Sequence, residues 1–233
     1  QHYFHHGGSQ QVKPLDNRTV VITGALGGLG TTVCAVAESQ GARVVRLDIA
    51  RDESLADSHS VDLTNAEATL ELIQSLGPFD GLINLAGGFA MGSESWDPSD
   101  DQWDLMFSLN VATMRNAIKA AVPVLLEQPM ASIVNVGAYG AREGQGHMGA
   151  YCASKSVVMR LTETLAEELK TKGINVNGVL PTVIDTPANR AAMPEADATA
   201  WASSDDLAAV ICFLSSSAAR AVNGALIPVR GLS

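Results

Sequence analysis

Two side chains in the second half of the chain have the types and the spacing of a proton-transfer pair. Tyr151 and Lys155 stand four residues apart, so on a helix they share one face, one turn apart. Apolar residues at spacings of three and four between Val157 and Lys172 predict that helix. A fixed ammonium beside a phenol favours the phenolate and lowers the tyrosine pKa from its ordinary value of about 10. The alternative interpretation is an exposed helical pair without chemistry.

The pKa shift that proton transfer near neutral pH requires points to a second cation. Lowering a tyrosine pKa by about 3 units takes roughly 4 kcal/mol, which is more than one screened charge supplies. The pair at Tyr151 and Lys155 therefore predicts that a bound cationic ring lies beside it.

A glycine-rich turn near the start of the chain stands between an expected strand, 18–23, and an expected helix, 31–40. Its G-x-x-x-G-x-G spacing allows a tight turn and a close approach of the backbone to a pyrophosphate at a helix N-terminus. The alternative is a turn without a ligand. The cofactor contacts expected here are Gly24, Leu26, Gly27, Gly28, Leu29 and Gly30.

A second expected strand, 42–47, ends at Asp48. An acidic residue about 20 positions after such glycines holds a ribose 2′-hydroxyl and repels a 2′-phosphate. Asp48 therefore favours NAD(H) over NADP(H), although Arg46 and Arg51 nearby keep NADP(H) as the less favoured alternative. The other interpretation of Asp48 is a solvated carboxylate at a strand end.

Two further strands are expected before the middle of the chain. A brief third strand precedes Asp62, which we expect either to contact an adenine edge or to cap a helix over 65–76. A fourth strand, 79–85, ends in small residues that let a flat ring lie against it. The cofactor contacts expected in this part of the chain are Ile49, Asp62, Leu63, Asn84, Ala86 and Gly87.

The rest of the chain continues the alternation. Strands are expected over 131–136, 174–180 and 225–229, and helices over 101–127, 150–172 and 205–215. The segment 188–201 is expected to form a short lid. Asn110 lies inside the first of these helices, where an asparagine is a poor helix former and ordinarily faces water.

This order of elements predicts the fold class. Strands that alternate with helices form one parallel sheet with helices on both faces and ligand sites at the strand carboxyl ends. We expect a single α/β domain over residues 14–233, a Rossmann-type doubly wound parallel sheet of about seven strands. The histidine-rich opening, residues 1–13, is expected to be an expression tag and spacer, with a metal site as the alternative.

Composition limits the classes of molecule that the protein is expected to bind. The formal net charge of −10 over 233 residues argues against a nucleic-acid or anionic-membrane surface. No apolar run approaches a membrane span, so a small molecule is the expected partner. Three widely spaced cysteines, Cys34, Cys152 and Cys212, fit small core residues in a reducing cytosol. We therefore expect a cytoplasmic protein.

Taken in order, these residues resemble the short-chain dehydrogenase/reductase family over residues 17–231. The resemblance implies that Tyr151 is the proton donor or acceptor, Lys155 lowers its pKa and holds the ribose, and Asn110 anchors a water in the proton relay. It implies that Thr186 meets the nicotinamide carboxamide, and that helices around 101–127 and 150–172 build a homodimer or homotetramer. The further cofactor contacts that it implies are Val136, Tyr151, Lys155, Pro181, Val183 and Thr186.

One family residue is missing from this chain. The serine that the family places thirteen residues before the tyrosine is replaced by Ala138, and neither Tyr139 nor Gln145 is an assured substitute. Losing one such hydrogen-bond donor costs roughly 10²-fold or more in rate where the chemistry depends on it. The substrate contacts expected around this position are Ala138, Gln145, His147 and Met193.

The dihydropteridine reductase branch of the family resembles this chain more closely and also lacks that serine. The similar stretches are 86–89, 146–151 and 180–197, followed by Trp201. The resemblance implies an NADH-dependent reductase of a conjugated C=N or C=O substrate such as a quinonoid dihydropterin, although Asn110 belongs to the general family pattern. Two alternatives stay open. One is a carbonyl reductase or alcohol dehydrogenase in which Gln145, His147 or a water replaces the serine, and the other is a non-catalytic dinucleotide-binding sensor.

Overall fold

The computed structural model describes residues 12–232, and its centre is a seven-stranded parallel sheet. The strands lie in the order β3-β2-β1-β4-β5-β6-β9, and every neighbouring pair is parallel. The expected doubly wound α/β fold is confirmed. The strands are β1 (Thr19–Thr23), β2 (Arg43–Asp48), β3 (Ser58–Ser60), β4 (Gly81–Asn84), β5 (Ala131–Val136), β6 (Ile174–Pro181) and β9 (Leu226–Val229).

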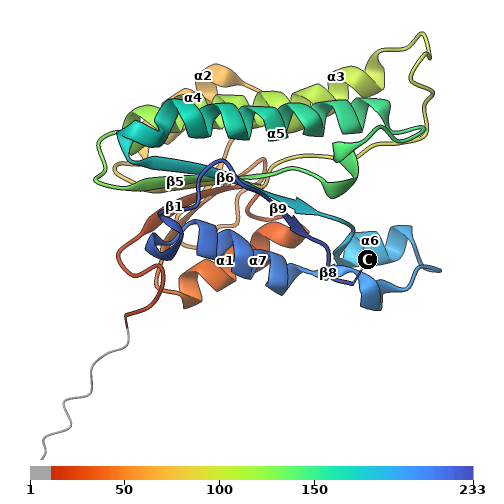
Figure 1. Cartoon of the computed structure of the whole chain (residues 1–233). Helices are drawn as coiled ribbons and strands as arrows, with labels where there is room; N and C mark the ends of the chain where they lie inside the picture. The colour runs from red at the N-terminus through yellow and green to blue at the C-terminus, as the bar shows by residue number, and fades with distance from the viewer. Residues whose placement is uncertain (1–11, 233) are drawn as a thin grey trace, which may run out of the picture.

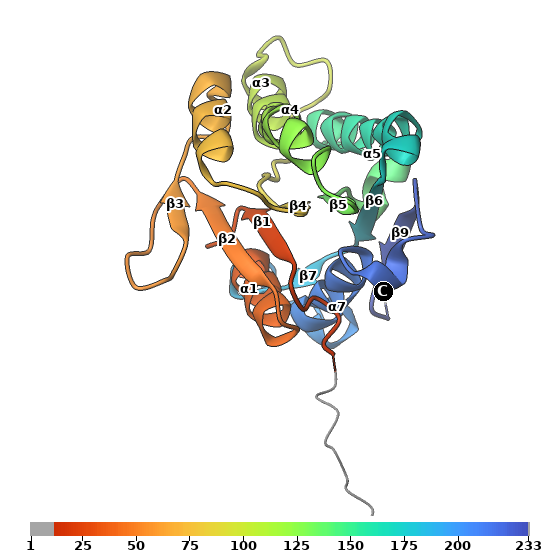
Figure 2. The same cartoon turned by 90° about the vertical axis from the view of Figure 1, so that its left-hand side faces the viewer.

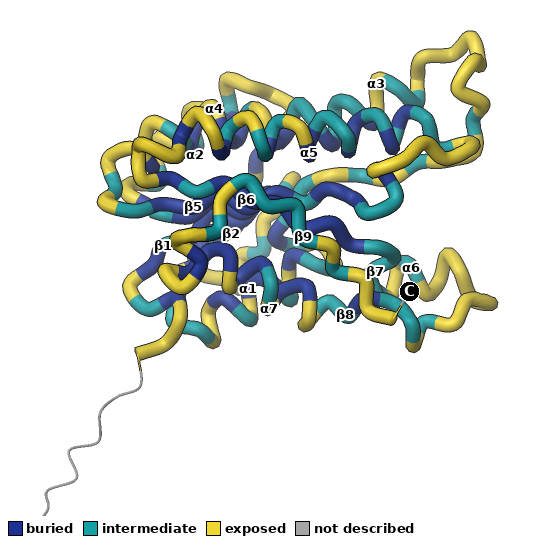
Figure 3. Tube along the Cα trace, in the orientation of Figure 1, coloured by how far each residue is buried: buried dark blue, intermediate teal, exposed yellow. Residues whose placement is uncertain are grey.

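Helices cover both faces of the sheet (Figures 1 and 2). One face carries α1 (Gly28–Ser39) and α7 (Ser204–Leu214). The other face carries α2 (Ala66–Ser75), α3 (Asp101–Phe107), α4 (Thr113–Leu125) and α5 (Gly149–Leu169). The buried residues gather in the sheet and on the sides of the helices that face it (Figure 3).

The sheet separates two apolar cores because successive strand residues point to opposite faces. Val21 of β1 packs with Leu82, Ile118 and other residues of one core, whereas Val20 and Ile22 pack in the second core. Strands that are buried on both faces are expected to be apolar throughout, as these are.

The strand order reverses between β1 and β4, its neighbour on the side away from β2. In open α/β sheets, ligands bind in the crevice outside the strand carboxyl ends at such a reversal. The loop before α3 and the short helix α6 (Pro187–Ala192) lie at that end of the molecule (Figure 1).

The helix expected over 101–127 is interrupted. A five-residue π-helix, Ser108–Ala112, separates α3 from α4. Asn110 lies in this wider helical turn and points into the protein, where it is only 2% exposed. The expectation that Asn110 faces water is therefore wrong. Insertions of this kind are frequent at functional sites.

Two other local expectations change. Helix α1 begins at Gly28 instead of residue 31, so two of the glycines lie in its first turn. The expected lid contains α6 and a 3₁₀ turn, Ala198–Ala200, and a small two-stranded sheet joins its two ends. That sheet pairs β7 (Ile184–Asp185) with β8 (Ala202–Ser203).

Residues 1–11, most of the expected tag, lie outside the described residues, so neither interpretation of that segment is tested. Within residues 12–232, no group of three His, Cys, Asp or Glu side chains could hold a metal ion. No helix in the same range is long and apolar enough to cross a membrane. All three cysteines are buried and free, as expected of core residues.

Candidate active site

The glycine-rich turn is packed so tightly that side chains are excluded from it. Gly24 has a φ of +63°, and a Cβ there would lie 2.8 Å from the backbone nitrogen of Ala86. A Cβ on Gly30 would lie 2.0 Å from the carbonyl oxygen of Gly24. The turn therefore packs against the residues that follow β4, and α1 begins directly after the turn, at Gly28. This arrangement fits a pyrophosphate, which needs exposed backbone N–H groups at a helix N-terminus.

Asp48 joins the end of β2 to that turn. Its Oδ2 accepts a hydrogen bond from the backbone nitrogen of Leu26 at 2.9 Å, and its Oδ1 accepts one from Ile49 at 2.7 Å. The carboxylate thus stands beside the glycine turn, and the exposed Ile49 side chain follows it. These positions suit a ribose and a flat base.

The two arginines near Asp48, Arg46 and Arg51, form ion pairs with glutamates. Arg46 is buried, and its guanidinium contacts Glu38 at 2.6 Å and the carbonyl of Ala56 at 3.1 Å. Arg51 forms an ion pair with Glu53 at 3.2 Å. Arg46 is therefore bound on the α1 side of β2.

Asp62 and Asn84 both form hydrogen bonds within the protein, and their expected contacts with a cofactor stay predictions. The Asp62 carboxylate accepts hydrogen bonds from the backbone and hydroxyl of Thr64, while Asn65 caps α2. The interpretation of Asp62 as the helix cap is therefore wrong. Asn84 is buried and donates to Asn135 Oδ1 at 2.8 Å, so its side chain lies inside the protein. Leu63 is buried in the core.

Tyr151 and Lys155 lie in the first two turns of α5, as their spacing predicts. The buried ammonium of Lys155 donates a hydrogen bond to the carbonyl of Val136 at 3.0 Å. Burial lowers the pKa of Lys155 to about 8. Burial also raises the pKa of Tyr151 to about 12, with a smaller contribution from Cys152. The tyrosine pKa is raised because burial disfavours the charged phenolate. The lowering that the sequence predicts depends on a bound cationic ring and stays a prediction.

Asn110 links the end of β4 to α5 through three hydrogen bonds. Its Oδ1 accepts from the backbone nitrogen of Gly88 at 2.8 Å, and its Nδ2 donates to the Gly88 carbonyl at 3.0 Å. The same Nδ2 donates to Ser154 Oγ at 3.0 Å, and Ser154 donates to the carbonyl of Tyr151 at 2.9 Å. The asparagine thereby holds the loop after β4 against the Tyr151 helix.

Gly87 lies beside two of the three candidate catalytic residues. A Cβ on Gly87 would lie 2.7 Å from Asn110 Oδ1 and 3.5 Å from Lys155 Nζ. The structure thus brings Asn110 and Lys155 together behind the strand end, with Tyr151 one helical turn away.

The base of the lid lies against the glycine turn. A Cβ on Gly28 would lie 3.5 Å from the Thr186 side chain. Thr186 caps α6, accepting a hydrogen bond from the backbone nitrogen of Asn189 at 3.2 Å. Pro181 ends β6, and the carbonyl of Val183 accepts from Ala202. Thr186 therefore lies between the glycine turn and α6, and its contact with a carboxamide stays a prediction.

The expected substrate residues occupy different surroundings. Ala138 is buried in an apolar cluster against which Tyr151 packs. Gln145 bends back to donate to the Gly140 carbonyl at 3.0 Å. His147 has a φ of +60°, and its Nδ1 lies 3.8 Å from an oxygen of Glu94. Met193 follows α6 and is 37% exposed.

Sequence reasoning assigned no role to Phe89. Its ring meets the ring of Tyr151 edge-on, with centroids 4.8 Å apart and an interplanar angle of 79°. The signal in the sequence was an aromatic residue directly after Gly87 and Gly88, at a strand end.

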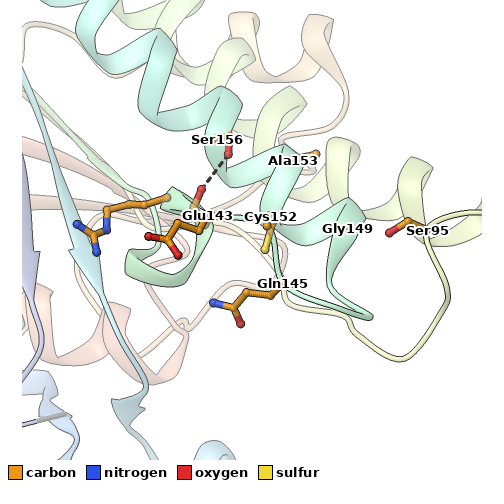
Figure 4. Close-up of a pocket in the computed structure, with 10 residues that line it drawn as sticks. Ser95, Glu143, Gln145, Gly149, Cys152, Ala153 and Ser156 are labelled. Atoms are coloured by element: carbon orange, nitrogen blue, oxygen red, sulfur yellow. Dashed lines mark hydrogen bonds between the residues drawn. The ribbon is translucent and has the colours of Figure 1, made fainter.

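A cavity of about 470 Å³ lies beside the candidate dyad, and Tyr151 and Lys155 do not line it. It opens between the start of α5 and the loop that precedes the helix (Figure 4). A hydrogen bond of 2.9 Å from Ser156 to the Ala141 carbonyl fixes part of its wall. Its lining residues are Ser95, Ala141, Arg142, Glu143, Gly144, Gln145, Gly149, Cys152, Ala153 and Ser156.

Comparisons with known proteins agree with this geometry. Residues 18–197 match the family model described as short chain dehydrogenase. The short chain dehydrogenase adrF of Penicillium rubens is 30% identical, with 92% of this chain and 96% of that protein covered. The crystal structure of carveol dehydrogenase from Mycobacterium avium in complex with NAD superposes with a TM-score of 0.82 at 25% identity, covering 94% and 98% of the two chains. A putative 2-deoxy-D-gluconate 3-dehydrogenase from Agrobacterium tumefaciens with bound NADP gives a TM-score of 0.84 at 29% identity, covering 93% and 96%.

Proposed function

Since the chain belongs to the short-chain dehydrogenase/reductase family, we propose that it is an NADH-dependent reductase of a conjugated C=N or C=O substrate, similar in its reaction to dihydropteridine reductases. The chain is an NAD(P)-dependent oxidoreductase, and this proposal adds the cofactor preference, the substrate class and the residues that act. Tyr151 is the proposed proton donor.

The glycine turn and the residues around it provide the cofactor site. Backbone N–H groups of the turn would hold the pyrophosphate, Asp48 the adenosine ribose, Lys155 the second ribose and Thr186 the carboxamide. When bound, reduced nicotinamide supplies the hydride. The remaining contacts are proposed for Leu26, Gly27, Leu29, Ile49, Ala86, Gly87 and Val136.

Asp48 supports NADH over NADPH. Its carboxylate is held beside the glycine turn by two backbone N–H groups, so it repels a 2′-phosphate placed there. Arg46, the nearest candidate to neutralise that phosphate, is bound to Glu38. Both observations favour the cofactor without the phosphate.

The replacement of a hydroxyl by Ala138 is the observation that carries the substrate class. A methyl group in that buried position cannot donate a hydrogen bond to a substrate carbonyl. A conjugated ring that spreads its developing charge needs that donor less than an isolated ketone does. Tyr151 then supplies the proton, and Lys155 and Asn110 hold the helix and the strand end around it.

The names of the neighbours favour a second candidate. Carveol dehydrogenase and the putative 2-deoxy-D-gluconate 3-dehydrogenase are named for the oxidation of alcohols. A carbonyl reductase or alcohol dehydrogenase would need another donor at Ala138, and Gln145 would first have to leave the Gly140 carbonyl.

The deciding experiment measures NADH oxidation at neutral pH with quinonoid dihydropterin beside a panel of ketones. The unaltered protein is compared with Tyr151→Phe. We expect turnover of the pterin to exceed that of simple ketones and to fall by about 10²-fold or more in the variant. Equal turnover of simple ketones would favour the carbonyl reductase, and binding of NADH without turnover would contradict the proposed substrate class.

The assembly and the compartment belong to the same proposal. We propose one catalytic domain, residues 14–233, which associates as a homodimer or homotetramer through the helices around 101–127 and 150–172, in the cytoplasm, where thiols stay reduced. Light scattering after size-exclusion chromatography measures the assembly, and a monomer at micromolar concentration would contradict it.

A further inference from the structure

Phe89 is a large apolar residue that is exposed to solvent and contacts the proposed proton donor, Tyr151. Its side chain is 58% exposed although its ring contacts Tyr151 at a centroid distance of 4.8 Å. Most of the surface of this ring is thus available to a ligand within reach of the tyrosine hydroxyl.

The backbone directly before Phe89 is held in place by Asn110. Asn110 binds both the N–H and the C=O of Gly88, the residue directly before Phe89. A Cβ on Gly88 would lie 2.7 Å from Leu109 Cδ1, so this part of the loop is pressed against the π-helix. The backbone at the start of the Phe89 loop is therefore held by hydrogen bonds to Asn110, and the Phe89 ring rests on Tyr151.

An apolar cluster also packs against Tyr151. Ala138 presents a methyl group in the buried cluster on which Tyr151 packs, and Tyr139 and Met148 pack partly buried on the same cluster. An aromatic ring on one side and an apolar cluster on the other give the phenol surroundings that suit a flat, weakly polar ring.

We propose that Phe89 is a wall on which the substrate stacks, so that the enzyme selects planar conjugated rings over saturated rings of the same size. Aromatic pairs prefer offset-stacked or edge-to-face arrangements with centroids about 4.5–7 Å apart, and such arrangements contribute beyond the area that they bury. A saturated ring buries similar area on Phe89 and lacks this additional attraction. The proposal rests on the proposed function, because it places the reacting atom of the ring beside Tyr151.

The test measures binding directly. Fluorescence anisotropy follows 6-methylpterin, a flat fluorescent bicycle, bound to the full chain with NAD⁺, and trans-1-decalone, a saturated bicycle, displaces it. We expect Phe89→Leu to bind the pterin about tenfold more weakly and the decalone unchanged, and Phe89→Trp to keep pterin binding. Met91→Leu, in the same loop and also exposed, is the matched control and should leave both affinities unchanged.

Three outcomes would overturn the proposal: no preference of the unaltered protein for the flat ring, an unchanged pterin affinity in Phe89→Leu, or an equal loss in Met91→Leu. Folding is checked by thermal unfolding and NADH affinity, which the exposed Phe89 should not affect. The proposed function fails separately, when Tyr151→Phe turns over substrate at the unaltered rate while the stacking result at Phe89 stands.

Discussion

The amide of Asn110 and the hydroxyl of Ser154 lie 3.0 Å apart in the interior, where they join the end of a sheet strand to the helix of the proposed proton donor. The Ser154 hydroxyl donates a hydrogen bond to the carbonyl of Tyr151, and the Asn110 side-chain oxygen accepts one from the backbone nitrogen of Gly88. The side chains of Asn110 and Ser154 are both hydrogen-bonded within this network, so removing either one takes a hydrogen-bond partner from a buried polar group of the other.

Ser154→Ala should therefore weaken the fold more than the loss of an ordinary hydroxyl. The change removes the acceptor of Asn110 Nδ2, although that nitrogen keeps its bond to Gly88. We expect the free energy of unfolding to fall by about 1–3 kcal/mol, measured by urea denaturation. The matched control is Ser156→Ala, which removes a half-buried hydroxyl of the same helix bound only to Ala141. An equal effect of the two changes would contradict the importance of the buried link.

Stability should rise with pH through the titration of Lys155. Burial holds its pKa at about 8 in the folded protein, against about 10.4 in an unfolded chain. Between these values the unfolded state binds more protons, so the free energy of unfolding increases with pH by up to roughly 3 kcal/mol. Tyr151, whose folded pKa is about 12, acts in the opposite direction only above about 10.

Urea denaturation of the unaltered protein and of Lys155→Met across pH 7.5 to 10 checks this prediction. The variant should lack the rise, because methionine keeps the length of the side chain without a titrating group. A rise of the same size in both proteins would assign it to other groups.

The sequence was sufficient to predict the layers of the fold and the position of the glycine-rich turn between a strand and a helix. Strands β1 and β5 are short runs rich in β-branched residues, each followed directly by a glycine, and Asp48 ends a strand at the expected distance from the glycine turn. Such features depend on residues near one another in the chain, where local preferences act.

The inward position of Asn110 could not be predicted in the same way. It depends on hydrogen bonds to Gly88 and Ser154, which are 22 and 44 residues away in the chain. The direction of the Tyr151 pKa shift depends on burial by the folded protein, which the i, i+4 spacing does not contain. The edge contact with Phe89 likewise exists only after the strand end and α5 have packed together.

Asp48→Asn should relax the choice of cofactor. The change keeps the oxygen that accepts from Leu26 and removes the negative charge beside the glycine turn. Hydrogen bonds to charged groups contribute about 1.5–3 kcal/mol, so NADH should bind roughly 10- to 100-fold more weakly. Fluorescence titration with NADH and NADPH measures both affinities, and the preference for NADH should shrink. A preference that is unchanged would show that another residue discriminates against the phosphate.

Ala138→Ser tests whether the methyl group at this position restricts the substrate. The serine hydroxyl would stand in the apolar cluster beside Tyr151, where it can donate to a substrate carbonyl. We expect kcat/KM for simple ketones to rise by about tenfold or more, because one such donor is worth roughly 10²-fold where the chemistry depends on it. Turnover of the conjugated substrate should change little, since its charge is already spread over the ring.

Ala141→Ser places a hydroxyl at another buried position of the same loop and should raise neither activity. If ketone turnover rose equally in both variants, or if Ala138→Ser improved both substrate classes alike, the alanine would not be what separates them.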